Sequence, residues 1–349
     1  MKTLRFVIDP AKVASGETEK ALERAAGILR GGGLVALPTE TVYGLGANAL
    51  DAAAVGRIFA AKERPTWDPV IVHVADEKML DGLVKEVPEA ARKLMKAYWP
   101  GPLTLLLRRT AAVPDVVTAG RPLVAVRMPA HPVALELIRR AGVPVAAPSA
   151  NLFGHTSPTT AEHVLADLDG RIDAVLDAGP TEHGVESTVL DPNTSPMMIY
   201  RPGAVTRAQI LETAGAVEVY HESAALQTKP HEALVSPGLG LRHYAPRARL
   251  VLVEGELAEL AARLESALND LSKEQVGVML PGEVDAPEGV TAVFRWGRWA
   301  APEEMARDLY AGLRALDSVG CTVILCPLPP ADGIGAAIRD RLLKAGNRE

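Results

Sequence analysis

The chain has 349 residues, of which 48% are hydrophobic, 23% charged and 4% aromatic. Its length exceeds what one compact core usually holds and predicts two domains of ordinary globular composition. The formal net charge of -6 argues against a general nucleic-acid coat protein, although a local group of cations could still bind a small anion. No apolar run is long enough to span a membrane, and the first ten residues lack a signal-peptide pattern, so we expect a cytoplasmic protein.

Cysteine occurs twice, as Cys321 and Cys326, within one apolar run. On a strand, an odd offset places two side chains on opposite faces. We therefore interpret both as reduced core residues, and we expect neither a disulfide nor a metal pair.

Short apolar runs alternate with helical patterns through the first two hundred residues. A helix at 18–31 has apolar residues three and four apart and ends at three glycines, and a second helix starts after Asp51 and ends before Pro65. Further helices are expected at 89–98, 132–141 and 161–168. Strands are expected at 34–37, 70–74, 103–107, 124–127, 143–147, 174–177, 187–190 and 198–200. This order predicts an α/β fold in which helices flank a mixed sheet.

The periodic pattern fails between residues 221 and 247, where proline and glycine recur. Long connections of this kind are often functional. Strands are then expected at 250–253, 276–280 and 323–326, and helices at 256–271, 302–316 and 334–344. That order predicts a small Rossmann-like α/β domain, but without a glycine-rich phosphate loop the fold alone predicts no ligand. We expect three parts, namely a catalytic domain at 1–220, a linker at 221–247 and a C-terminal domain at 248–349.

Two cations, Lys62 and Arg64, follow the second expected helix. Pro65 favours an extended backbone at Arg64, and two residues apart in an extended chain both side chains can point the same way and flank one anion. By themselves such cations are most simply explained as solvated residues at a helix end. The apolar strand that follows places them at a sheet edge, which favours phosphate binding.

A polar loop follows the expected strand 143–147. Ser149 and Asn151 offer a hydroxyl and an amide to phosphate oxygens, and loops after strand ends are where α/β proteins bind ligands. A polar turn that caps the next helix explains the loop equally well.

Arg127 ends an apolar strand, where a buried guanidinium is costly unless it is paired. Its fork matches a ligand carboxylate, which we favour over an ion pair with a buried acid. The segment 38–46 adds hydroxyls and Glu40, which could be a base or a partner for one of the cations at 62 and 64. His73 alternates with apolar neighbours and by itself is more typical of a satisfied core histidine.

The expected linker contains Arg242, Tyr244 and Arg247, and the residues from 242 to 249 include no acid. Such a segment could fold over an anionic ligand as a lid, or it could be a solvated connection between domains.

Taken in order, these segments resemble the Sua5/YrdC/YwlC family of threonylcarbamoyl-AMP synthases. The matching segments are PTETVYGLG, KERP followed by PVIVHV, WPGPLTLLL, VAVRMP, PSANLFGHTSPT, ESTVLD and YRPG. The linker SPGLGLRHYAP and the domain after it match the longer Sua5 form. The resemblance implies a YrdC-like domain with a twisted mixed sheet. It also implies synthesis of L-threonylcarbamoyladenylate from L-threonine, bicarbonate and ATP with Mg²⁺, which releases pyrophosphate. A downstream transferase would pass the group to adenosine 37 of tRNA.

Residue by residue, the resemblance implies two groups of contacts. The nucleotide would be held by Lys62, Arg64, Thr66, Ser149, Asn151, Ser157, Arg201 and Tyr244. Threonine would be held by Thr39, His73, Arg127 and Ser187. Lys62, Arg64 and Arg127 would be catalytic, no residue would be a metal ligand, and alanine at 62 or 64 would abolish activity while leaving the fold stable. The chain departs from the family at Asp68, at Phe153 and at 239–240, where a basic residue is absent and Arg242 could substitute.

Two other functions stay open. An RNA-binding module could use the same cations, but the acidic charge and scarce aromatic residues weigh against it. A carbamoyltransferase could share the carbamoyl-adenylate chemistry while consuming carbamoyl phosphate. The sequence has no acylphosphatase-like or cysteine-rich zinc region of the kind that such multidomain enzymes often contain.

Overall fold

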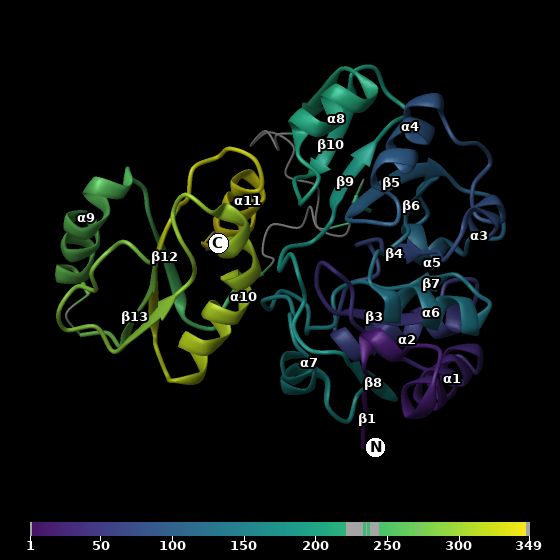
Figure 1. The fold of residues 1–349 in the computed structure, drawn as a ribbon, viewed down its shortest axis with the longest axis horizontal. Helices are drawn as coiled ribbons and strands as arrows, with labels where there is room; N and C mark the ends of the chain where they lie inside the picture. The colour runs from purple at the N-terminus through teal and green to yellow at the C-terminus, as the bar shows by residue number, and fades with distance from the viewer. Residues whose placement is uncertain (1, 221–232, 235, 238–243, 272, 347–349) are drawn as a thin grey trace. The chain divides into compact units, whose positions relative to one another are not determined.

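The computed structural model describes residues 2–220, 233–234, 236–237, 244–271 and 273–346 (Figure 1). These residues form two compact units. The first comprises 1–153, 158–182 and 186–240, and the second comprises 154–157, 183–185 and 241–349. Most of the expected linker lies outside the described residues, so the boundaries at 220 and 247 stay predictions.

The first unit is built on one large mixed sheet, which confirms the predicted fold class. Its strands, in spatial order, are β1 (Leu4–Val7), β8 (Ala174–Asp177), β2 (Val35–Leu37), β3 (Gly44–Asn48), β7 (Val145–Ala146), β4 (Ile71–His73), β6 (Leu123–Arg127), β5 (Leu103–Arg108), β9 (Thr188–Asp191), β10 (Met197–Arg201) and β11 (Val217–Val219). The sheet contains parallel pairs such as β4 with β6 and antiparallel pairs such as β5 with β6.

Helices cover both faces of this sheet. They are η1 (Pro10–Lys12), α1 (Gly16–Arg30), α2 (Ala52–Lys62), α3 (Glu77–Asp81), α4 (Glu89–Tyr98), α5 (Asp115–Thr118), α6 (Pro132–Ala141), α7 (Ala161–Leu168) and α8 (Arg207–Ala214). One hydrophobic core packs α1 and α6 against β2, β7 and β8, and a second packs α2, α4, α7 and α8 against alternate side chains of the sheet. Because side chains alternate along a strand, β2, β7 and β8 contribute to both layers.

The two faces of the central strands β4, β6, β5 and β9 pack differently. Alternate residues such as Val72, Val126 and Leu105 pack into the helical core behind them. On the other face the apolar contacts shrink to a small cluster that includes Ile71 and Ala125. Since side chains repeat every two residues, this face also presents the polar residues that follow in the same strands.

The strand β3 was not predicted, because the segment 38–46 resembles a turn with two glycines. Gly46 pairs with Val35 of β2. A β-carbon there would lie 2.9 Å from side-chain atoms of both Leu37 and Val145, so only glycine fits between these two side chains. The short elements β1, η1, β11, α3, α5 and α8 were also missed, as was β14 (Ala292–Arg295) of the second unit.

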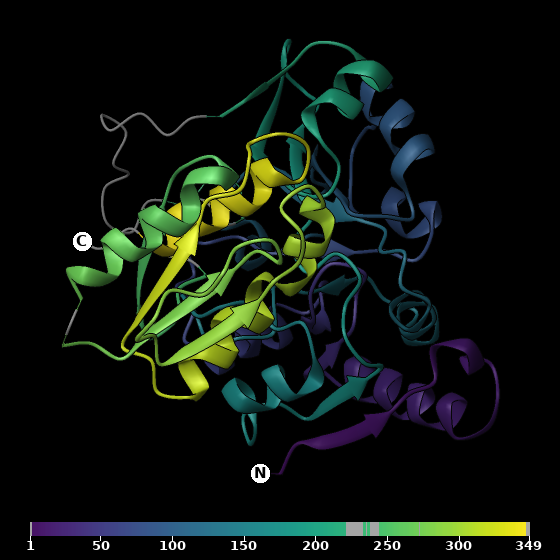
Figure 2. The same cartoon turned by 60° about the vertical axis from the view of Figure 1, so that its left-hand side comes forward.

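The second unit is the predicted small Rossmann-like domain. Its sheet is wholly parallel, with the order β12 (Arg249–Val253), β15 (Val323–Pro327), β13 (Val276–Leu280) and β14 (Ala292–Arg295). Its helices are α9 (Leu257–Asn269), α10 (Pro302–Ser318) and α11 (Gly335–Gly346). Figure 2 shows the strands side by side, and Figure 1 shows α9 on one face with α10 and α11 on the other.

Both thiols, Cys321 and Cys326, are free and buried in this unit, as expected. Among the described residues, no helix combines the length and the apolar character needed to cross a membrane.

Candidate active site

Lys62 ends α2 and is almost completely buried. Its ammonium Nζ donates to the backbone carbonyls of Ser149, at 2.6 Å, and Asn151, at 2.5 Å. Burial lowers the pKa of Lys62 well below its ordinary value, and the nearby charge of Arg64 lowers it further. The structure therefore brings together two segments that the sequence keeps 87 residues apart, and Lys62 fixes the shape of the second one.

The backbone between Lys62 and Arg64 is not extended, so the prediction of an extended chain there is wrong. Glu63 adopts a left-handed conformation with φ 55° and caps α2. The guanidinium of Arg64 instead donates to the carbonyls of Asp68 and Pro69 and forms an ion pair with the buried Asp68 carboxylate at 2.9 Å. Each cation is thus held by its own set of oxygens.

The loop between β2 and β3 joins this region to the central strands. The backbone N–H of Ala150 donates to the carbonyl of Tyr43 at 2.8 Å, and Gly44 bridges to Ser149. Within the loop, the Thr39 hydroxyl donates to the carbonyl of Val42 at 2.6 Å and lies 2.8 Å from the Thr41 hydroxyl. Both threonines are buried, so the loop is organised by its own polar groups.

Arg127 is buried at the end of β6 and forms an ion pair with Glu40, with 2.6 Å between Nη2 and Oε1. Its Nη1 donates to the Thr41 hydroxyl at 2.9 Å, and its Nε donates to the carbonyl of Gly101 at 3.1 Å. Glu40 is therefore the partner of Arg127, and the suggestion that it pairs with a cation at 62 or 64 is wrong. The ion pair, which the sequence offered as the second explanation of Arg127, is present.

In this cluster the Glu40–Arg127 pair is charged, whereas the neighbouring His73 is neutral. Burial alone would raise the pKa of Glu40, but the charge and hydrogen bond of Arg127 hold that pKa below its ordinary value. His73 lies beside Arg127 across the β4–β6 pair. Burial, with the Arg127 charge, lowers the pKa of His73 to about 3. The imidazole is therefore neutral, and its Nδ1 has no hydrogen-bond partner among the described residues.

Lowering the pH is expected to destabilise the fold through His73. Its imidazole has an ordinary pKa of 6.5 in the unfolded chain and about 3 in the fold. Between these two values only the unfolded chain binds the proton. The free energy of unfolding therefore decreases by at most about 1.4 kcal/mol for each unit by which the pH is lowered. His73→Gln should flatten this dependence in urea titrations. Equal slopes for the variant and the original chain would contradict the assignment.

Ser187 lies just before β9 and is held by two partners. Its hydroxyl lies 2.8 Å from that of Thr104, and Nη2 of Arg201 donates to it at 3.1 Å. Arg201 also donates to the carbonyl of Ser187. Thr104 was missed by the sequence analysis, although it is the one polar residue in the apolar run 103–107.

These clusters form one continuous region of the first unit. Arg127 bonds to the carbonyl of Gly101, and the next carbonyl, that of Pro102, accepts from the N–H of Thr188 beside Ser187. The region therefore runs from Lys62, through the loop at 39–44 and Arg127, to Ser187.

The remaining three predicted residues are placed as follows. Thr66 is exposed in the turn after Arg64. Ser157 is buried and belongs to the second unit. Tyr244 also belongs to that unit, where its ring stacks on Tyr310 with 5.9 Å between centroids and the Arg341 guanidinium lies over it.

The arrangement favours an anionic ligand with polar functional groups. Three cations, several hydroxyls and a neutral imidazole are buried in this region, and the cations Lys62, Arg127 and Arg201 each donate to backbone carbonyls. Among the described residues there is no group of three or more His, Cys, Asp or Glu side chains that could hold a metal ion.

Comparison with known families identifies this architecture. A family profile described as "Telomere recombination" matches residues 27–203, and one described as "Threonylcarbamoyl-AMP synthase, C-terminal domain" matches residues 205–347. The chain belongs to the Sua5/YciO/YrdC family.

Its relatives include proteins that match over almost the whole chain. A threonylcarbamoyl-AMP synthase from Pyrococcus abyssi is 45% identical over 323 residues, which are 92% of each chain. One from Bacillus subtilis is 43% identical over 348 residues, 99% of this chain and 98% of that one. The crystal structure of P. abyssi Sua5 complexed with L-threonine superposes with a TM-score of 0.90 at 42% identity and covers 99% of this chain and 98% of that one.

Proposed function

We propose that this chain synthesises L-threonylcarbamoyladenylate from L-threonine, bicarbonate and ATP, the first step of the threonylcarbamoyl modification of adenosine 37 in tRNA. The full-length similarity to proteins named threonylcarbamoyl-AMP synthase supports the reaction. Within this chain, the proposed reaction is supported by the continuous buried region that joins Lys62 to Arg127 and Ser187.

The ATP phosphates would bind at the Lys62 end of this region. Lys62 and Arg64 would supply positive charge, and Ser149 and Asn151 would supply neutral donors, on a loop whose carbonyls are already fixed. Fixed donors lose little freedom on binding, so this end is suited to hold a triphosphate in one geometry. Thr66, Ser157, Arg201 and Tyr244 are proposed as further nucleotide contacts from the resemblance alone.

Threonine would bind at the Arg127 end. The guanidinium of Arg127 has five N–H donors, and Glu40, Thr41 and the Gly101 carbonyl occupy part of them, so a threonine carboxylate could share the fork. The neutral His73 and the hydroxyls of Thr39 and Ser187 would surround the rest of the amino acid. The P. abyssi relative was crystallised with L-threonine, which supports this part of the proposal.

In the proposed reaction, the threonine amine and bicarbonate first give a carbamate and water. A carbamate oxygen then attacks the α-phosphorus of ATP in line, the bond to the β-phosphate oxygen breaks, and pyrophosphate leaves. No protein nucleophile is needed, because positioning and charge neutralisation do most of the work in such transfers. Mg²⁺ bound to the phosphate oxygens and water would neutralise further charge.

The segment 221–247 is proposed as a lid that keeps water from the carbamate and the mixed anhydride. Handing the product to a downstream tRNA-modifying transferase and a cytoplasmic location are further proposals. The two free thiols are compatible with a reducing compartment.

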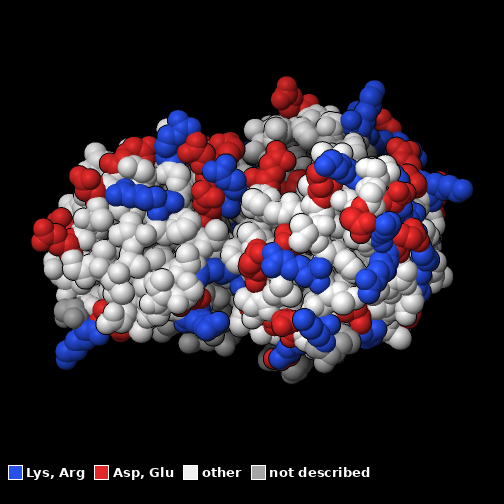
Figure 3. Space-filling model, turned by 60° about the horizontal axis from the view of Figure 1, so that its bottom comes forward, with Lys and Arg blue, Asp and Glu red and all other residues white. Residues whose placement is uncertain are grey.

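The alternatives have less support. On the face shown in Figure 3, basic and acidic side chains are interspersed, which does not favour a nucleic-acid surface. The carbamoyl-phosphate alternative would need another carbamoyl donor, and no relative reported above bears such a name.

The function is tested by mass spectrometry of the purified protein with ATP, Mg²⁺, bicarbonate and L-threonine, each omitted in turn. We expect threonylcarbamoyl-AMP and pyrophosphate only when all three substrates are present. Product that forms from carbamoyl phosphate without bicarbonate would favour the carbamoyltransferase. Folded protein that makes no product under any condition, yet binds RNA with a steep salt dependence, would favour the RNA-binding module.

A further inference from the structure

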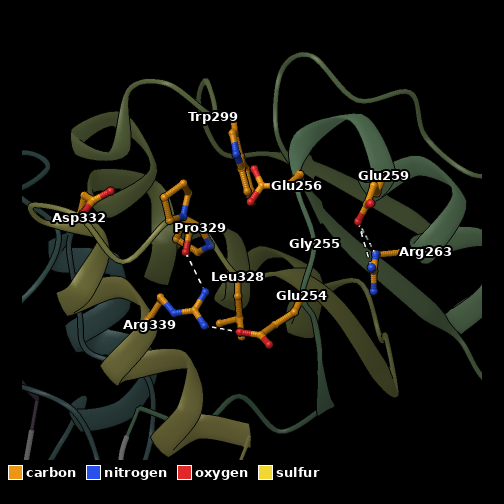
Figure 4. Close-up of a pocket in the computed structure, with 11 residues that line it drawn as sticks. Glu254, Gly255, Glu256, Glu259, Arg263, Trp299, Leu328, Pro329, Asp332 and Arg339 are labelled. Carbon is orange, nitrogen blue, oxygen red and sulfur yellow. Dashed lines mark hydrogen bonds and ion pairs between the residues drawn. The ribbon is translucent and has the colours of Figure 1, made fainter.

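The second unit contains a cavity of about 680 Å³ (Figure 4). Residues that follow β12, such as Glu254 and Glu256, form one wall, and residues that follow β15, such as Pro329 and Asp332, form another. Its volume lies within the range of small-molecule sites. All of its lining residues belong to this unit, and none of them is a predicted residue of the candidate active site.

The topology of the sheet places this cavity where α/β folds bind ligands. The strands β12 and β15 are parallel neighbours, yet the chain leaves β12 for α9 and leaves β15 for α11. These two helices lie on opposite faces of the sheet (Figure 1). A crevice therefore opens between the two strand ends, and such switch points are the usual ligand sites of open α/β sheets.

One wall of the cavity is the indole of Trp299, which is only 9% exposed. Its backbone N–H is held by the Glu283 carboxylate at 3.1 Å, which fixes the start of the side chain. The indole N–H of Trp299 forms no hydrogen bond within the described part of the chain. This donor is therefore available to an acceptor on a ligand or to a water in the cavity.

Among the described residues, two of the carboxylates that line the cavity have no cationic partner. Arg339 pairs with Glu254 and also donates to the carbonyl of Pro329, and Arg263 pairs with Glu259 (Figure 4). Within the described part of the chain, the remaining carboxylates of Glu256 and Asp332 form no ion pair or hydrogen bond. The cavity therefore has a surplus of two negative charges and no spare cation.

The α9 helix explains part of this charge, because acids are favoured at a helix N-terminus and Glu256 is the N-cap. It does not explain the nearly buried indole beside Glu256 (Figure 4) or the carboxylate of Asp332 on the opposite wall. An aromatic face with nearby carboxylates recognises organic cations, and a planar guanidinium also stacks on indole.

We propose that this cavity binds an arginine group. Its guanidinium would stack on Trp299 and donate to the carboxylates of Glu256 and Asp332, and its carbonyl oxygen would accept from the indole N–H. Leu328 and Pro329 would contact the aliphatic chain. A free arginine derivative and an arginine residue of a partner protein present the same chemistry.

The test is a calorimetric titration of the full-length protein with Nα-acetyl-L-arginine amide and with the citrulline counterpart, which has the same shape without the charge. We expect saturable binding of one equivalent, at least about tenfold tighter than citrulline. The tripeptide Gly-Arg-Gly separates the two sources. Binding of both ligands assigns the site to arginine residues in a chain, and binding of the amide alone assigns it to free derivatives.

Substitutions of lining residues test whether the ligand binds in this cavity. Glu256→Gln, Asp332→Asn and Trp299→Leu are each expected to weaken it by about tenfold. Glu265→Gln removes the same charge from an exposed position of α9 outside the lining and should have no effect. The two carboxylate variants alter exposed side chains, so they keep the test valid if Trp299→Leu fails to fold. Equal affinity in all variants, equal binding of citrulline, or no binding would overturn the proposal.

Discussion

Replacing Lys62 with alanine is expected to reduce threonylcarbamoyl-AMP formation by at least roughly 10²-fold, because a fixed charge beside the phosphates is lost. The same change should also destabilise the protein. The carbonyls of Ser149 and Asn151 would lose their ammonium donor in a buried place, at about 1–3 kcal/mol for each carbonyl left unsatisfied. The sequence alone suggested a cation that could be removed without harm to the fold, and the burial of Lys62 changes that expectation.

Lys62→Gln separates the two effects. Its amide can still donate to one of the carbonyls, so the free energy of unfolding in urea should recover in part, whereas the missing charge should keep the rate low. Lys96→Ala, at an exposed position of α4, is the matched control and should leave both quantities unchanged. A Lys62→Gln enzyme with the original rate would show that this charge does not act on the phosphates.

Replacing Arg127 with methionine is expected to abolish threonine binding and to destabilise the fold. Glu40 would be left charged, nearly buried and without its partner, and breaking a buried ion pair in this way costs about 3–5 kcal/mol. Threonine affinity is measured by calorimetry and stability by urea unfolding. Arg139→Met, which removes an exposed guanidinium from α6, should cost less than about 1 kcal/mol and leave binding intact.

The double variant Glu40→Gln with Arg127→Met decides between a structural and a binding role. Removing both charges should restore much of the stability, because no unpaired carboxylate remains. Threonine binding should stay absent if Arg127 contacts the ligand. Restored binding in the stable double variant would mean that Arg127 serves only the ion pair.

The same pair also makes a prediction for pH. Arg127 keeps the pKa of Glu40 below its unfolded value, so this contribution to stability is present above the unfolded pKa and is lost as the pH falls through the folded one. In Arg127→Met, burial should instead raise the Glu40 pKa. The variant should then lose less stability than the original chain as the pH falls, and unfolding measured at several pH values checks this.

Local sequence patterns were enough to predict most of the regular elements. Asp51 accepts from the N–H groups of Ala53 and Ala54 at the start of α2, as its position before an apolar stripe suggested. The helices α4, α6 and α7 have the predicted bounds, since apolar spacing and caps act over one or two turns. The strand β3 escaped because Gly46 is required by packing against Leu37 and Val145, which lie on the two strands that flank β3, and the order of strands cannot be read from local sequence.

The sequence by itself determined which residue types are available to the site and the family to which the chain belongs. It also indicated that Lys62, the loop at 149–151 and Arg127 act together, because they recur in a recognisable order. Only the tertiary structure decided how they are paired, with Lys62 on two carbonyls, Arg64 on Asp68 and Arg127 on Glu40. The reason is physical. A buried charge must find a partner, and which partner lies within reach depends on the strand register and loop paths that bring distant segments together.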